Sequence, residues 1–184
     1  MTAAPRWLTP AELAAWLPVG GLLLKLPAAL DTQMQRDSGL SHFEYLVLAS
    51  LSEAPERTRR MSALAALANG SLSRLSHVVK RLEAKGWITR QACKEDGRYT
   101  NAVLTDAGWE KVVASAPGHV EAVRSLVLDT LTEGELEQLG DIARRILTRL
   151  DAAGDTARPL PEHADDYRTR VGRNSGPVDN RPRA

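Results

Sequence analysis

The sequence feature that most constrains the fold is the segment 71–86, SLSRLSHVVKRLEAKG, whose apolar and polar residues separate when it is wound as a helix. At about 100° per residue, one face carries Leu72, Leu75, Val78, Val79 and Leu82. The other face is rich in hydroxyl groups and cations: Ser73, Arg74, Ser76, His77, Lys80 and Arg81. Ser71 can cap the start of this helix, and Gly86 can end it in the left-handed conformation. We expect a buried face that includes Leu72 and a polar face suited to phosphates and base edges.

A helix of this kind is also compatible with an ordinary solvated surface helix, so its surroundings must decide. The net charge of the 184-residue chain is only +1, but the charge is unevenly distributed. Residues 57–98 carry ten basic and three acidic side chains, a net +7, whereas residues 1–56 and 99–150 each carry −3. A basic segment between acidic flanks is typical of a domain that binds a polyanion such as DNA.

The segment before this helix predicts a helix-turn-helix. Ser62 can cap a short helix, residues 63–68, that points Leu64 and Leu67 inward, and Asn69-Gly70 favours a tight turn. Two short helices joined in this way are the helix-turn-helix arrangement, in which the second helix enters the major groove.

The segment after it predicts a β-hairpin. Residues 87–92 and 100–104 have β-propensity, and Asp96-Gly97 between them is a strong turn signal. The hairpin would present Lys94 and Arg98 at its tip, where a cation suits the electronegative minor groove. The sequence thus predicts a winged helix. We expect Arg57, Arg59 and Arg60 to lie in a solvated loop.

Residues 61–108 resemble the MarR family of winged-helix transcriptional regulators. The resemblance rests on the Leu-Ala pair of the short helix, on LEAKG at 82–86, on the wing Asp-Gly-Arg at 96–98 and on LTDAG at 104–108. It implies that Asp96 orients the wing tip and that Arg98 enters the minor groove. It also implies a dimer formed by the terminal helices. The expected DNA-binding residues are Ser71, Ser73, Arg74, Ser76, His77, Lys80, Arg81, Lys94, Asp96 and Arg98.

Helical segments flank the winged helix on both sides. Capping boxes begin helices at Thr9, Ser41 and Thr132, and Thr105 can cap another. Pro18, Gly20-Gly21 and Pro27 should divide the first segment into two or three linked pieces, and Pro117 should kink or break the helix after Thr105. The last helix has an apolar stripe with no place to pack inside one winged helix, which favours contact with a second copy. The stripe comprises Leu136, Leu139, Ile142, Ile146, Leu147 and Leu150.

The fold class expected is therefore mainly α with a small β-hairpin wing, an α+β winged helix-turn-helix. A MarR-type domain would span 1–150, with dimerisation helices at about 9–37 and 106–150 and a DNA-binding module at about 41–104. The tail, 151–184, is rich in Pro, Asp, Arg, Gly and Asn, and we expect it to be disordered. No uninterrupted apolar run approaches the roughly 18 residues of a membrane span, and the single cysteine fits a reducing compartment. We expect a cytoplasmic protein that does not bind membranes.

The sequence shows no catalytic constellation, phosphate-binding loop or metal-ligand spacing, so we expect neither an enzyme nor a cofactor or metal. A small aromatic or phenolic effector is a possible partner, and Trp16, Met34 and His42 are candidates for its pocket. Cys93, beside Lys94, leaves a thiol-based redox sensor open.

The leading hypothesis is a homodimeric, ligand-responsive transcriptional regulator, a repressor, that binds a pseudo-palindromic operator in double-stranded DNA. The alternative is a winged-helix protein-interaction module without specific DNA binding.

Overall fold

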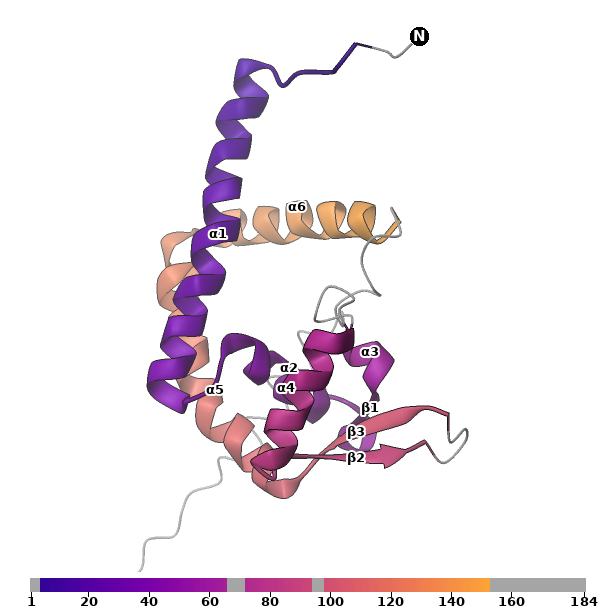
Figure 1. The fold of residues 1–184 in the computed structure, drawn as a ribbon. Helices are drawn as coiled ribbons and strands as arrows, with labels where there is room; N and C mark the ends of the chain where they lie inside the picture. Colours follow the sequence, from indigo (N-terminus) through magenta and orange to yellow (C-terminus); the bar gives the residue numbers. More distant parts are fainter. Residues whose placement is uncertain (1–3, 66–71, 94–97, 153–184) are drawn as a thin grey trace, which may run out of the picture.

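The structure, a computed structural model, describes residues 4–65, 72–93 and 98–152. It is mainly helical with one small sheet, so the expected winged-helix fold class is confirmed (Figure 1). The elements are α1 (Pro10–Ser38), α2 (His42–Ser52), η1 (Pro55–Arg57), β1 (Thr58–Arg60), α3 (Met61–Ala65), α4 (Leu72–Ala84), β2 (Ile88–Ala92), β3 (Thr100–Leu104), α5 (Asp106–Leu126), η3 (Leu128–Thr130) and α6 (Glu133–Ala152).

The sheet has three antiparallel strands in the order β1-β3-β2. The expected hairpin is its β2–β3 pair, with Ile88 opposite Leu104 and Ala92 opposite Thr100. The strand β1 was not expected, because its residues were assigned to a solvated loop. It pairs with β3 over three residues, Thr58 opposite Val103 through Arg60 opposite Asn101. That assignment is wrong because a strand this short shows no periodicity in the sequence.

One apolar core lies between α2, α3, α4 and the sheet and continues to α1 and α5. Its fully buried side chains include Met34 of α1, Leu48 of α2, Leu75 of α4 and Ile88 of β2. The apolar face of α4 is therefore packed on the core, and the polar face of α4 points outward.

The expected face of α4 is confirmed with one exception. Leu75, Val78, Val79 and Leu82 are buried, and Gly86 ends the helix in the left-handed region with φ of 75°. Leu72 was expected in the core but is 51% exposed. It lies in the first turn of α4, where periodicity gives its direction but not whether another element covers it. Ser71, Leu67 and Asn69-Gly70 lie outside the described residues. The short helix before them occupies Met61–Ala65, so Ser62 is inside it and not at its cap.

The capping boxes were predicted correctly. At the start of α1, the backbone N–H of Thr9 donates to the Glu12 side chain and that of Glu12 donates to the Thr9 side chain. Ser41 and Glu44 form the same pair of bonds at the start of α2. At the start of α6, the Thr132 N–H donates to Glu135 Oε2 at 2.8 Å. These reciprocal bonds satisfy backbone donors that the first turn of a helix leaves free.

The first helical segment is not divided into pieces, and the helix after Thr105 is not broken. The helix α1 runs without interruption through Pro18 and Pro27, and α5 runs through Pro117. A proline removes one hydrogen bond to the carbonyl four residues earlier. Those carbonyls belong to the exposed residues Ala14, Leu23 and Val113, so water can bind them and the helices continue.

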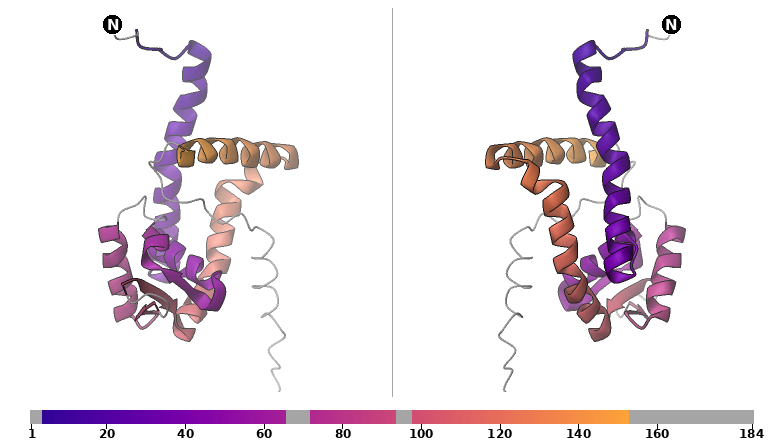
Figure 2. Two further views of the ribbon diagram at one scale, coloured as in Figure 1. Left: turned by 90° about the vertical axis from the view of Figure 1, so that its right-hand side faces the viewer. Right: turned by 90° about the vertical axis from the view of Figure 1, so that its left-hand side faces the viewer.

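The amino-terminal half of α1 and all of α6 extend beyond the winged-helix module (Figure 2). The buried residues of α1 are Leu30, Gln33 and Met34, near its carboxyl end, and no residue of α6 is buried. The sequence has no long uninterrupted apolar run, yet α1 is long and apolar enough to cross a membrane, with an 18-residue window of mean hydropathy 1.6 that is 6% buried. Length and composition alone are weak grounds for such a span.

Candidate nucleic-acid interface

The outward face of α4 has the composition that the sequence predicted. Because the apolar face packs on the core, the polar side chains have no room to turn inward. All six candidates in the described part of the helix are exposed: Ser73, Arg74, Ser76, His77, Lys80 and Arg81. Ser71 lies outside the described residues. The face therefore combines hydroxyl groups, an imidazole and three cations over about three turns of helix.

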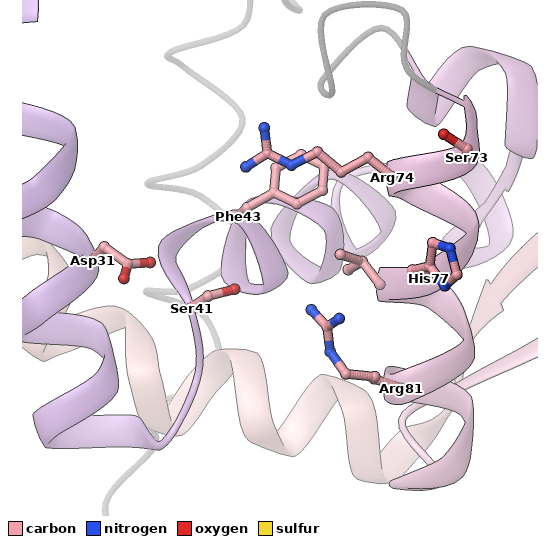
Figure 3. A pocket seen from close by; sticks show the side chains of 8 residues that line it. Asp31, Ser41, Phe43, Ser73, Arg74, His77 and Arg81 are labelled. Atoms are coloured by element: carbon pink, nitrogen blue, oxygen red, sulfur yellow. The ribbon is translucent and has the colours of Figure 1, made fainter. Parts of the chain in front are cut away.

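A groove separates α4 from the amino-terminal end of α2. Its volume is about 480 Å³, and it is lined by Asp31, Ser41, Phe43, Ser73, Arg74, His77, Val78 and Arg81. Figure 3 shows the side chains of Arg74 and Arg81 extending from α4 toward α2. One edge of the polar face is thus engaged with the protein itself, whereas Ser76 and Lys80 do not line this groove.

Both arginines that line the groove contact α2. The guanidinium carbon of Arg74 lies 5.1 Å from the centre of the Phe43 ring. Arg81 Nε donates to Glu44 Oε1 at 3.0 Å. This ion pair has no signal in the sequence, because its partners are 37 residues apart.

Of the three expected DNA-binding residues of the wing, only Arg98 lies within the described structure. Lys94 and Asp96 lie outside the described residues, and Arg98 is exposed just before β3. At the end of β3 nearer the wing tip, the guanidinium carbon of Arg60 of β1 lies over the Tyr99 ring at 4.9 Å from its centre. The sequence predicted a solvated loop for Arg60, and its place in β1 was not foreseen. The structure therefore places a third cationic position, in addition to those on α4 and at Arg98, on the wing side of the module.

Cys93 lies at the end of β2 and is buried, with 8% of its surface exposed. Its N–H donates to the Tyr99 carbonyl at 2.8 Å. Burial limits access of an oxidant to the thiol, which argues against a redox sensor at this position.

Two other arginines of the basic segment have structural contacts. Arg57 forms an ion pair with Asp106 at 2.9 Å and lies 4.5 Å from the centre of the Trp109 ring. Arg59 Nε donates to the Ser50 carbonyl at 2.9 Å. Arg57 thus joins η1 to α5, and Arg59 joins β1 to α2, so neither side chain projects freely from a loop.

The candidate effector residues do not gather at one place in a single chain. Met34 is fully buried in the core, His42 is half-buried at the start of α2, and Trp16 is 54% exposed. Trp16 and Met34 are separated by about 27 Å along α1, at 1.5 Å per residue. An effector pocket that uses all three would need a second chain.

His42 instead belongs to a junction of α1, α2 and α5. The backbone N–H of His42 donates to Asp31 Oδ1 at 2.7 Å, and the centre of the His42 ring lies 5.3 Å from that of the His119 ring. His119 also contacts the Tyr45 ring, and its Nδ1 is buried without a hydrogen-bond partner. Burial lowers the pKa of both imidazoles; the nearby His42 lowers the pKa of His119 further, and Asp31 partly opposes the shift in His42. Both rings are therefore neutral near pH 7.

Within the described ranges, His, Cys, Asp and Glu side chains nowhere gather in a group of three that could hold a metal ion. The candidate residues that the structure shows exposed are the six polar side chains on the outward face of α4, with Arg60 and Arg98 exposed on the wing side.

Comparisons with known proteins agree with this geometry. The MarR family model matches residues 40–100, which include α2, α4 and β2 and end at the start of β3. Among curated proteins, the transcriptional repressor MprA of Escherichia coli (strain K12) is 26% identical over 119 residues, which are 65% of this chain and 67% of MprA.

Two solved structures are more similar. Sco3205 of Streptomyces coelicolor, a MarR family transcriptional regulator in complex with DNA, is 43% identical with a TM-score of 0.77 over 82% of this chain and 97% of that one. AbsC, a MarR family transcriptional regulator from the same organism, is 35% identical with a TM-score of 0.75 over 80% and 99% of the two chains. With this identity over nearly the whole length of both relatives, the protein belongs to the MarR family of transcriptional regulators, which are not enzymes.

Proposed function

We propose that the protein is a homodimeric transcriptional repressor that binds a pseudo-palindromic operator and releases it when a small ligand binds. The exposed polar face of α4, opposite the buried residues Leu75, Val78, Val79 and Leu82, is the observation that carries the proposal. The structure of Sco3205 in complex with DNA and the repressor activity in the name of MprA support it. A role on DNA would place the protein in the cytoplasm.

The proposal assigns base reading to the amino-terminal half of α4. In a helix-turn-helix the first residues of the second helix meet base edges, and later residues meet the backbone. Ser73, Ser76 and His77 would face bases, and Lys80 would neutralise a phosphate. Arg98 would enter the minor groove, with Lys94 on adjacent phosphates and Asp96 orienting the tip.

Dimerisation is proposed through the terminal helices, residues 9–37 and 106–150, leaving residues 41–104 as the DNA-binding module. Large apolar side chains are exposed on α1, α5 and α6, and exposed apolar side chains in such number are typical of an interface. They include Trp16, Leu17, Leu23, Leu24, Val120, Leu126, Ile142, Ile146 and Leu150. A second copy would bury this surface and set two α4 helices about one turn of DNA apart. The residues after Ala152, which the tail assignment covers, lie outside the described structure.

The ligand is proposed to be an aromatic or phenolic compound that binds between the terminal helices and the module. The half-buried His42 and the core residue Met34 lie at the carboxyl end of α1 and the start of α2, and Trp16 would be supplied by the partner subunit. A thermal-shift screen with aromatic carboxylates and phenols tests this, because a ligand that binds only the folded state raises its melting temperature.

A gel-shift titration against the DNA that flanks the gene tests the main proposal. Lys80→Ala with Arg98→Ala should abolish the shift, whereas Lys111→Ala, which removes a cation that lies over Trp87, should leave it intact. Tight binding that survives the double substitution would contradict the assigned roles. A protein-interaction module would instead bind DNA weakly, with no preference over random sequence.

A further inference from the structure

The ion pair between Arg81 and Glu44 joins the candidate recognition helix to α2. Both oxygens of the Glu44 carboxylate are in use: Oε1 accepts from Arg81 Nε at 3.0 Å, and Oε2 accepts from the Ser41 N–H at 2.9 Å. The Glu44 side chain is only 7% exposed, and that of Arg81 is 56% exposed. A buried carboxylate that the capping box already holds is thus a fixed anchor for the guanidinium.

Glu44 is charged in the folded protein at neutral pH. Burial raises the pKa of its carboxyl, but the Ser41 N–H, the Arg81 guanidinium and the charge of Lys85 together outweigh burial and leave the pKa below the usual value. Taking Arg81 away from this ionised, buried carboxylate would remove its ion-pair partner and leave the Ser41 N–H and the charge of Lys85 to stabilise it, which is unfavourable. Moving Arg81 to a DNA phosphate would therefore cost its bond to Glu44.

The place of Arg81 in α4 points the same way. It follows Leu72 by nine residues, or about 14 Å along the helix axis, whereas recognition helices read bases with their first turns. Two further contacts hold the same helix: Arg74 lies over Phe43 at 5.1 Å, and Thr105 Oγ1 donates to the Gly86 carbonyl at 2.7 Å. The orientation of α4 is thus fixed from α2 on one side and from the start of α5 at its carboxyl end.

We propose that Arg81 is a positioning residue that sets the angle at which α4 meets DNA through its bond to Glu44, and that it does not itself bind a phosphate. This rests on the proposed function, because it assigns a role within DNA recognition. It gives two neighbouring cations of α4 different roles: Lys80 binds the DNA backbone, and Arg81 orients the helix that carries the base-reading side chains.

The test compares Arg81→Gln, Glu44→Gln and the double variant, with Lys80→Gln as the matched control for loss of a phosphate contact on the same helix. The probes are a duplex that the wild-type protein enriches from a random-sequence pool and a random duplex of equal length. Dissociation constants are measured over a series of salt concentrations, well below each melting temperature, with circular dichroism to establish that each variant is folded.

A positioning role predicts that each single substitution at Arg81 or Glu44 weakens binding to the enriched duplex by about tenfold, a typical coupling for residues in contact. The double variant should bind the enriched duplex no less tightly than whichever single variant has the lower affinity. Binding to random DNA and the salt dependence should match the wild type. Lys80→Gln should weaken binding to both duplexes and reduce the slope of log K against log salt by about one.

Three results would overturn the inference or its basis, and they can be told apart. If Arg81→Gln behaves like Lys80→Gln while Glu44→Gln has no effect, Arg81 is a phosphate contact. If the melting temperature falls but neither affinity changes, the ion pair only stabilises the fold. If the wild-type protein enriches no sequence at all, the proposed function itself fails.

Arg81→Lys covers the case in which Arg81→Gln does not fold. Lysine keeps the cation but lacks the planar Nε donor. A phosphate contact would survive this change, whereas a positioning role predicts weaker binding to the enriched duplex with the salt slope unchanged.

Discussion

The helices α4 and α6 both have an amphipathic sequence, but in a single chain the apolar face of α4 is buried and that of α6 is exposed. The apolar stripe of α4 is buried against the core, with Leu75 and Val79 fully covered. On α6, Ile142 and Ile146 are 48% and 51% exposed. An amphipathic sequence thus predicts that the apolar face of a helix is buried, but only the structure shows which element covers it. For α4 it lies within the chain; for α6 we propose that it is a second chain.

The charge distribution follows the same division. The basic segment, with its net +7, contains α3, α4 and β2, which pack into one core with α2 and β3 of the flanks. The acidic flanks also contain α1, α5 and α6, which leave large apolar side chains exposed. Specific binding to DNA would therefore depend on α4 for contacts and on the terminal helices for the spacing of two copies.

Charging the apolar stripe of α6 should have the largest effect. Ile142→Arg with Ile146→Arg would place two cations in the proposed interface, so we expect monomers and a loss of at least about a hundredfold in affinity for a two-half-site duplex, because each half-site would then bind alone. Thr148→Arg, on another face of α6, is the control and should remain dimeric. Light scattering after size exclusion gives the mass; a monomeric wild type would refute the proposed interface.

The two leucines of α4 test the burial contrast within one helix. Leu75→Ala should lower the free energy of unfolding by about 2–5 kcal/mol because it opens a cavity in the core. Leu72→Ala, at a position that is 51% exposed, should change it by no more than about 0.5 kcal/mol. Urea denaturation at one protein concentration measures both. Equal losses would mean that Leu72 is covered in the native protein.

Glycine substitutions sharpen the comparison at the start of α5. A Cβ at Gly108 would lie 2.2 Å from the Trp87 carbonyl oxygen, whereas one at Gly134 in α6 meets no atom within 4 Å. Gly108→Ala should therefore cost about 1–3 kcal/mol, the usual range for overpacking. Gly134→Ala should be neutral or slightly stabilising, since alanine favours the helix. Thermal unfolding compares the two; a neutral Gly108→Ala would contradict the close contact.

The smallest effect concerns pH. Because the pKa values of His42 and His119 are lowered in the folded protein from an ordinary 6.5, the unfolded chain takes up protons first as the pH falls. Stability from these residues is complete above the ordinary pKa and is lost as the pH falls toward the lowered folded values. Denaturation between pH 7 and about 5 should show this decline, and His119→Phe should flatten it. A rise in stability on acidification would contradict it.

Much of the fold follows from local signals in the sequence. Capping boxes at Thr9 and Ser41, the helical period of α4 and the left-handed Gly86 each depend on residues within a few positions of one another. The apolar stripe of α6 likewise predicted an uncovered face.

The features that the sequence did not reveal depend on distant or solvent contacts. The strand β1 is too short for a pattern, and two successive residues with positive φ, Glu56 and Arg57, precede it. The continuity of α1 through Pro18 depends on solvent at its exposed side. The pairing of Arg81 with Glu44 depends on how α4 packs on α2. Reasoning from periodicity could place Arg81 on the polar face, but only the packed structure shows that its guanidinium is already bonded.

The most direct test of the account is the dependence of affinity on the spacing between half-sites. Once an enriched duplex is in hand, its centre is lengthened one base pair at a time through about half a helical turn. A rigid dimer of two α4 helices predicts that affinity falls by at least about a hundredfold as the second half-site rotates to the far side of the duplex. An affinity that does not change with spacing would show that the two copies do not read DNA together.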